Sequence, residues 1–231
     1  MKSHHESPIS VKFPLRGEWC AVNTPGERIP SHGTDLFGQT YAYDFIQIDW
    51  RKKKAFKFFD YSIFKGLLFG VPLNETYCWS QPIFAPFDCE VIEMSDGWVE
   101  RNPVHIVRDL FTAIKNGACL KSTNNKDLVP VLGNYVILRG AHAFSLIAHA
   151  KHQSIIVSEG ETLKEGQHIA DVGHSGNSTM PHLHFQLMDR RDLANAKGLA
   201  CCFNNLEIYN EDKWNAVSDY IPGRRERFRT Q

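Results

Sequence analysis

Short segments of β-type sequence, separated by Gly, Pro, Asn and Asp, dominate this chain and constrain its fold more than any other feature. Seven of them are rich in β-branched or aromatic residues, as half-buried strands are. They are Tyr41–Ile48, Pro82–Ala85, Cys89–Ser95, Asn134–Arg139, Ser145–Ala150, His168–Gly173 and His182–Met188. This pattern predicts a mostly β protein built on an antiparallel sheet or barrel.

Two glycines refine that prediction. Gly160 and Gly166 each follow a glutamate within the segment 157–173. Glycine at such positions supplies the positive φ of tight turns between short strands. Double turns of this kind occur in biotinyl/lipoyl-like β-domains and in barrels of the duplicated hybrid motif type, so the segment agrees with either without deciding between them.

Two segments interrupt the strands. Residues 50–79 are basic and aromatic, and we expect them to leave the sheet. Residues 103–132 contain the run His105–Lys115, whose apolar residues recur near helical spacing, with Gly117 as a stop signal. We therefore expect a short helix there, and loop or helical insertions at both places.

The length of the chain, 231 residues, suits one sizeable core with long insertions. We expect that core at residues 31–200, between an N-terminal extension (1–30) and a C-terminal extension (201–231). We expect the last ten residues to fray.

Charge and hydropathy limit the classes of partner. Lys and Arg together number 26, as do Asp and Glu, so no net field favours nucleic acid. No apolar stretch approaches the ~20 residues of a membrane-spanning helix. The N-terminal residues lack the apolar region of a secretory signal. The sequence leaves open whether the chain stays in the cell, leaves by another route or lacks a trimmed segment.

The cysteines, at positions 20, 78, 89, 119, 201 and 202, show no Cys-x-x-Cys spacing of a zinc site. Two of them are adjacent, which is a poor basis for a disulfide framework. We expect them mostly to be small buried hydrophobic residues.

The segment 176–186, Gly-Asn-Ser-Thr-Met-Pro-His-Leu-His-Phe-Gln, points most directly to chemistry. On a strand, residues i and i+2 face the same side, so His182 and His184 project together. A His-x-His pair alone is as often structural as functional. The Gly-Asn-Ser-Thr sequence and the proline before the pair make the pattern far more specific.

Three further residues are candidates for the same site. His149 ends an apolar run, where a structural edge histidine is the alternative interpretation. Asp44 has apolar neighbours on both sides, and an ionised carboxylate there is costly unless it is paired or bound to a metal. His32 lies in a Pro/Gly/Ser loop and is uninformative by itself.

Two histidines and an aspartate supply the three N/O ligands of a catalytic zinc and leave a fourth position open for water. Such a set could also accept other divalent metals. Two additional histidines near the open position could take a proton from water and steady an oxyanion.

At these residues the chain resembles the zinc endopeptidases of the lysostaphin/LytM type. The likeness covers roughly residues 31–190, and its separate blocks occur in the order of the family. The blocks are the strand Tyr41-Ala-Tyr-Asp-Phe, the hairpin Pro82–Gly97, the turn segment Glu-Gly-x-x-Leu-x-x-Gly and the final Pro-His-Leu-His-Phe.

The resemblance implies a role for each candidate. His184 and Asp44 would bind zinc, and His149 and His182 would form the catalytic pair. Members of the family commonly carry their first ligand four residues before the aspartate, where this chain has Thr40. We therefore assign the first ligand to the nearby His32.

Two points about this assignment stay open. Asp35 is the alternative carboxylate, although its loop setting suits a capping or solvated role better. Met180 stands where a small residue usually precedes the proline, and we expect it to narrow the rim of the cleft.

The function that the resemblance implies is hydrolysis of peptide bonds in peptidoglycan stem or cross-bridge peptides, with one Zn²⁺ per chain. That substrate would place the protein in the cell wall, in the periplasm or outside the cell. The alternative is a non-catalytic regulatory, binding or carrier module. The bond that is cleaved and the oligomeric state cannot be deduced from the sequence.

We also expect both insertions, residues 50–79 and 103–132, to border the same groove. There they would determine which substrates bind rather than take part in the chemistry. The first insertion carries aromatic residues that could grip a peptide, although packing on the core explains them about as well. They are Phe56, Phe58, Phe59, Tyr61 and Phe64.

Overall fold

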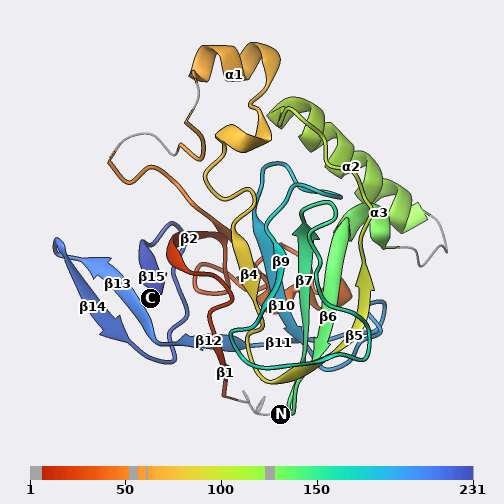
Figure 1. Cartoon of the computed structure of the whole chain (residues 1–231), viewed down its shortest axis with the longest axis vertical. Coiled ribbons are helices and arrows are strands. Elements are labelled where there is room, and N and C mark those ends of the chain that lie inside the picture. Colours follow the sequence, from red (N-terminus) through yellow and green to blue (C-terminus); the bar gives the residue numbers. More distant parts are fainter. Residues whose placement is uncertain (1–6, 52–56, 61, 123–127, 231) are drawn as a thin grey trace.

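The structure, a computed structural model, describes residues 7–51, 57–60, 62–122 and 128–230. Its main feature is a sheet of eleven strands, all paired antiparallel (Figure 1). The strands, in spatial order, are β14 (Lys213–Val217), β13 (Leu206–Asn210), β15 (Phe228–Thr230), β2 (Gly17–Asn23), β3 (Tyr43–Ile46), β10 (Leu183–Met188), β7 (Phe144–Ala150), β6 (Asn134–Arg139), β5 (Cys89–Ser95) and β8 (Thr162–Leu163), with β11 (Gly198–Leu199) paired to β10. The expectation of a mostly β, antiparallel fold is confirmed.

Two small sheets complete the β structure. Strand β1 (Ile9–Lys12) pairs in parallel with β12 (Cys201–Asn204). Strand β4 (Pro82–Phe84) pairs antiparallel with β9 (His168–Asp171). The φ angles of Gly160 and Gly166 are +82° and +78°, as expected for glycines in tight turns.

All seven expected strands are present, and two of them, β5 and β6, agree at both ends. The largest difference is at β3, which covers only the middle of the expected segment. Residues Leu36–Tyr41 form the 3₁₀ helix η1, so the chain returns to the sheet only after residue 41. This helix lies directly before the strand that carries Asp44.

The described α-helices and the 3₁₀ helix η2 lie in the two expected insertions. The first insertion contains α1 (Ile63–Phe69) and the 3₁₀ helix η2 (Leu73–Glu75). The second contains α2 (Ile106–Ser122) and α3 (Val129–Leu132). Figure 1 shows α1 and α2 beyond one end of the central strands.

The expectation that Gly117 ends the second helix is wrong, because α2 continues to Ser122. A glycine inside a helix costs only about 1 kcal/mol. Helix α2 also contacts α3, and the Asn116 amide donates to the carbonyl of Pro130 over 3.2 Å.

The expectation that the last ten residues fray is also wrong over the part that the structure describes. Strand β15 pairs with β13 and β2, and its Phe228 is fully buried. The Phe228 ring contacts Phe13 and Phe45, with ring centroids 5.0 and 6.0 Å apart. Burial of one aromatic side chain holds this segment in the sheet although its neighbours are polar and basic.

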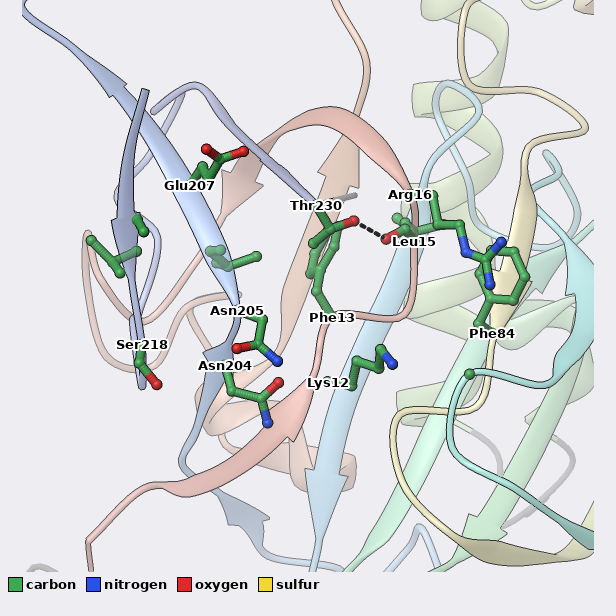
Figure 2. A pocket seen from close by; sticks show the side chains of 14 residues that line it. Lys12, Phe13, Leu15, Arg16, Phe84, Asn204, Asn205, Glu207, Ser218 and Thr230 are labelled. Atoms are coloured by element: carbon green, nitrogen blue, oxygen red, sulfur yellow. Dashed lines mark hydrogen bonds between the residues drawn. The ribbon is translucent and has the colours of Figure 1, made fainter. Parts of the chain in front are cut away.

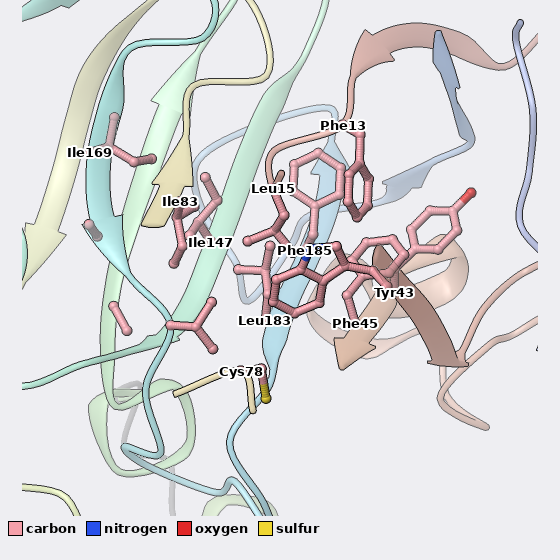
Figure 3. Close-up of a cluster of buried hydrophobic side chains, with 14 of the residues drawn as sticks. Phe13, Leu15, Tyr43, Phe45, Cys78, Ile83, Ile147, Ile169, Leu183 and Phe185 are labelled. Carbon is pink, nitrogen blue, oxygen red and sulfur yellow. The ribbon is translucent and has the colours of Figure 1, made fainter. Parts of the chain in front are cut away.

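The main core lies on one face of β3 and β10 (Figure 3). Tyr43 and Phe45 from β3, and Leu183 and Phe185 from β10, point into this core. Side chains alternate along a strand, so Asp44 and His184 face the other side of the sheet. The hydrophobic core therefore fixes the direction in which these two polar side chains point.

The cysteines that are described at side-chain level are buried and unpaired, as expected. Burial raises the pKa of the Cys78 thiol to about 12. Within the described residues, no helix combines the length and the apolar character needed to cross a lipid bilayer.

Candidate metal and catalytic site

Asp44 and His184 lie directly opposite each other on β3 and β10. Asp44 Oδ1 is 2.9 Å from His184 Nδ1, and Asp44 Oδ2 is 2.9 Å from His32 Nε2. One ligand atom from each of the three residues lies within 4.8 Å of the other two. The structure thus brings together the three residues assigned as metal ligands, and their binding of a metal stays a prediction.

His32 reaches this position because its loop is tied to η1. The amide of Ser31 donates to the carbonyl of Thr40 over 3.0 Å. The Ser31 hydroxyl lies 3.0 Å from His32 Nδ1 and leaves Nε2 to face the carboxylate. Thr40, which occupies the family's usual ligand position, therefore supports the loop that presents His32.

The two candidate carboxylates differ in environment. Asp35 is exposed, and Asp44 is buried and accepts a 2.6 Å hydrogen bond from the Asn23 amide. Burial alone would raise the pKa of Asp44. Electrostatic interaction with His32 and His182, with hydrogen bonds from His184 and His32, outweighs burial and holds the pKa well below its ordinary value. Asp44 is therefore the ionised member of the cluster.

Gln186, which sequence reasoning did not single out, fixes the orientation of His184. Its Nε2 donates to the carbonyl of Phe37 over 2.7 Å, so its Oε1 is the atom that faces His184 Nε2, 3.0 Å away. An amide oxygen only accepts, so His184 Nε2 carries a proton and donates to it, and this contact turns Nδ1 toward Asp44 Oδ1. The signal was available, because residue 186 shares a strand face with residues 182 and 184.

His149 and His182 form a second pair beside the cluster, with ring centroids 4.7 Å apart. His149 Nδ1 lies 2.9 Å from the carbonyl of Ser175, and His182 Nδ1 lies 2.7 Å from that of Met180. Because carbonyls only accept, both Nδ1 atoms carry the proton. The Nε2 atom of each ring then carries the lone pair, and that of His182 lies 3.5 Å from Asp44 Oδ1.

The backbone conformation of His149 and the pKa values of both histidines agree with rings that carry a proton only on Nδ1. His149 has a φ of +63°, a left-handed conformation that is uncommon outside glycine and clusters at functional sites. Burial, followed by repulsion from His182 and His184, holds the pKa of His149 well below its ordinary value. Burial also lowers the pKa of His182, although Asp44 opposes the shift. Both rings are neutral at neutral pH.

These five residues line one cavity of about 250 Å³. Val131 and Leu132 of α3 line it as well, so the second insertion borders the site as expected. The expectation for the first insertion is not met, because none of its described residues lines this cavity.

The aromatic residues of the first insertion also differ from the expectation. Phe58 and Phe59 are buried, and Phe64 is exposed. Phe56 and Tyr61 lie outside the described residues. The two buried rings pack edge to face with centroids 4.9 Å apart, so they are part of the core and not of a peptide-binding surface.

A larger cavity of about 670 Å³ lies elsewhere in the molecule (Figure 2). The Arg16 guanidinium stacks on the Phe84 ring there, 4.0 Å from its centroid, and Lys12 pairs with Glu165 at 3.3 Å. None of the five candidate site residues lines this cavity. The chemistry that the sequence predicts belongs to the smaller cavity.

The antiparallel sheet thus carries a buried His/Asp/His cluster with two further histidines beside it. Residues 108–196 match the model of peptidase family M23. The matched residues include His149, His182 and His184. The resemblance to the lysostaphin/LytM type is confirmed at this level.

Two curated proteins match part of this chain in sequence. The chain is 37% identical to the peptidoglycan DD-endopeptidase ShyA of Vibrio cholerae over 68 residues, which are 29% of this chain and 15% of ShyA. It is 32% identical to the peptidoglycan DD-endopeptidase ShyB of the same organism over 91 residues, 37% of this chain and 21% of ShyB. The matched segments thus span only a small part of each relative.

Solved structures with a similar arrangement have low sequence identity. The catalytic domain of lysostaphin from Staphylococcus simulans is 16% identical, with a TM-score of 0.37, over 79% of this chain and 88% of that one. The catalytic domain of the prophage-encoded M23 protein EnpA from Enterococcus faecalis is 16% identical, with a TM-score of 0.38, over 85% and 92%.

Proposed function

We propose that this protein is a zinc-dependent endopeptidase that hydrolyses peptide bonds in peptidoglycan stem or cross-bridge peptides. The observation that carries the proposal is one cavity lined by His32, Asp44 and His184 together with the neutral histidines His149 and His182. The names of ShyA and ShyB support the substrate class. In this proposal the catalytic core is residues 31–200.

The donor set fits zinc in its chemistry. Two imidazole nitrogens and one carboxylate are common zinc ligands, and three protein ligands leave a position for water. The remaining ring nitrogens of His32 and His184 face Ser31 and Gln186, as the outer nitrogens of metal-binding histidines usually face a hydrogen-bond partner. A zinc ion here supplies Lewis acidity, which polarises a peptide carbonyl and lowers the pKa of water toward ~7.

The other two histidines move the proton. Nε2 of one ring takes a proton from the attacking water, and the protonated ring later passes a proton to the leaving amine nitrogen. The carbonyls of Ser175 and Met180 hold the opposite nitrogens and keep both rings in the tautomer that can accept. Val131 and Leu132 form an apolar wall that reduces access of water.

A carrier module fits the cavity less well. A phosphohistidine carrier brings a phosphate to its histidine, and the buried, ionised Asp44 beside these rings would repel it. A non-catalytic regulator has no need of the complete set of candidate ligands that this chain retains.

The test combines metal analysis with digestion of cell walls. The purified protein should contain about one zinc per chain and should release peptide fragments from peptidoglycan, identified by mass spectrometry. A chelator should abolish release, and added zinc should restore it. Asp44→Ala should lack both zinc and activity, whereas the matched variant Asp35→Ala should keep both. A zinc-containing protein that cleaves no peptidoglycan peptide would contradict the proposal.

A further inference from the structure

Helix α2 of the second insertion carries a buried carboxylate that none of the steps above uses. The side chain of Asp109 is fully buried. It accepts hydrogen bonds from Arg101 Nε at 2.7 Å, Arg108 Nε at 2.9 Å and the backbone amide of His105 at 2.9 Å. Its fourth partner is His174 Nε2, at 3.2 Å.

Two routes lead from Asp109 to the loop that precedes the candidate catalytic histidine. On the first, Arg101 donates to the carbonyls of Gly176 and Ser178 over 2.9 and 2.8 Å. On the second, His174 Nδ1 lies 2.9 Å from the Ser178 hydroxyl. That hydroxyl lies 3.1 Å from Nδ1 of His182. Both routes therefore end at Ser178.

The donor and acceptor roles in these contacts determine which ring nitrogen of His174 carries a proton. A carboxylate only accepts, so His174 Nε2 carries a proton and donates it to Asp109. His174 is fully buried, as are Ser178 and Asp109. The Ser178 hydroxyl lies between the two imidazoles, and it also donates to the carbonyl of Met180 over 2.5 Å.

Packing alone does not account for this arrangement. Replacing a buried ionic network by apolar residues is often neutral or stabilising, so such a network is weak evidence for a stability role. The outer face of α2 is also unusual, because Val107, Leu110, Phe111 and Ile114 are exposed. Asp109 is thus a polar anchor that ties an otherwise peripheral helix to one particular loop.

We propose that Asp109, His174 and Ser178 are positioning residues for His182, so that helix α2 sets the orientation of this histidine in the cavity. The proposal rests on the proposed function, in which His182 moves a proton. Displacements of about 1 Å caused by distant substitutions can cost on the order of 100-fold in rate.

The experiment compares Ser178→Ala and Asp109→Asn with the wild-type protein and with Ser154→Ala. Ser154 is a matched control, because it is buried and its hydroxyl bonds the Lys151 carbonyl over 2.8 Å, outside this network. For each protein, kcat, KM and zinc content are measured. We expect Ser178→Ala and Asp109→Asn to keep one zinc per chain and a nearly unchanged KM, and to lose roughly 10- to 100-fold in kcat. Ser154→Ala should keep its kcat.

A second readout does not depend on turnover. In ¹⁵N-labelled protein, exchange of the His182 Nδ1 proton with water is measured by NMR. We expect faster exchange in Ser178→Ala than in the wild type or in Ser154→Ala, because one of the two groups that hold this proton is removed. Ser178→Ala remains informative if Asp109→Asn does not fold.

The outcomes separate the two proposals. Full kcat in a folded Ser178→Ala variant with unchanged proton exchange would overturn the positioning role and leave the proposed function intact. An inactive wild type would overturn the proposed function, and the exchange measurement would still decide whether Ser178 holds His182.

Discussion

His184 and Asp44 are direct partners in the β10–β3 pair, with Nδ1 and Oδ1 2.9 Å apart, although 140 residues separate them in the chain. A shift of one residue in this register would turn one of the two side chains into the aromatic core. The candidate metal cluster is therefore a product of strand register, which Phe45 and Phe185 hold from the opposite face.

The ligand assignment predicts which substitutions remove zinc. His184→Ala, Asp44→Ala and His32→Ala should each lower the zinc content far below one per chain, because two protein ligands do not make a complete zinc site. Asp35→Ala should retain zinc, since its carboxylate is exposed. Elemental analysis of dialysed protein measures this. Loss of zinc from Asp35→Ala, with zinc retained in Asp44→Ala, would show that the wrong carboxylate was chosen.

The catalytic pair should behave differently from the ligands. His149→Ala and His182→Ala are expected to fold and keep zinc, yet to lose roughly 10²- to 10⁴-fold in turnover, the usual contribution of a general base. Steady-state kinetics on a peptidoglycan peptide, with zinc content measured in parallel, checks the expectation. A variant with wild-type turnover would remove that histidine from the mechanism.

Gln186 should influence the metal without touching it. Gln186→Leu removes the acceptor of the His184 Nε2 proton, and we expect zinc affinity to fall about 10- to 100-fold, as for other groups that orient metal-binding histidines. Competition with a chromogenic chelator measures the affinity.

The matched control for Gln186 is Gln81→Leu. The Gln81 amide donates to the carbonyl of Tyr77 over 3.3 Å, remote from the cluster. Equal affinity of the two variants for zinc would contradict the role of Gln186.

Asp109 should make stability depend on pH. Burial alone would raise its pKa, but hydrogen bonds from His174, Arg108, the His105 amide and Arg101 outweigh burial and hold the pKa below its ordinary value. The stabilisation is then fully present above the unfolded pKa of about 4, and is lost as pH falls through the folded pKa.

Urea unfolding of Asp109→Asn and wild type at pH 7 and at pH 3 tests this. We expect the variant to be about 3–5 kcal/mol less stable at pH 7, the scale for breaking a buried ion pair, and the difference to shrink at pH 3. Asp35→Asn, at an exposed position, should show little difference at either pH. A constant difference for Asp109→Asn would mean that its charge does not contribute to stability.

Much of the fold could be predicted from the sequence, because period-two patterns are local. The same rule placed His182 and His184 on one face and identified Asp44 as a carboxylate that needs a partner. The extent of α2 past Gly117 and the pairing of β15 could not be predicted in this way, since contacts between distant segments decide them.

The candidate site also has parts that local patterns predict and parts that depend on contacts between distant segments. The assignment of His32 depended on a family resemblance, because its position results from the hydrogen bond between the Ser31 amide and Thr40. The contact of Asp109 with His174 joins an insertion helix to a loop 65 residues later. No local pattern marks such a contact, and only the folded chain reveals it.

The place of β15 between β13 and β2 has a consequence for synthesis of the protein. Strand β2 leaves the ribosome well before β15, so one of its edges stays uncovered until residues 228–230 have emerged. An uncovered edge can pair with another chain, so the nascent protein passes through a stage that favours association. Protection by a chaperone should therefore improve the yield of folded protein most in the interval between the emergence of β2 and that of β15.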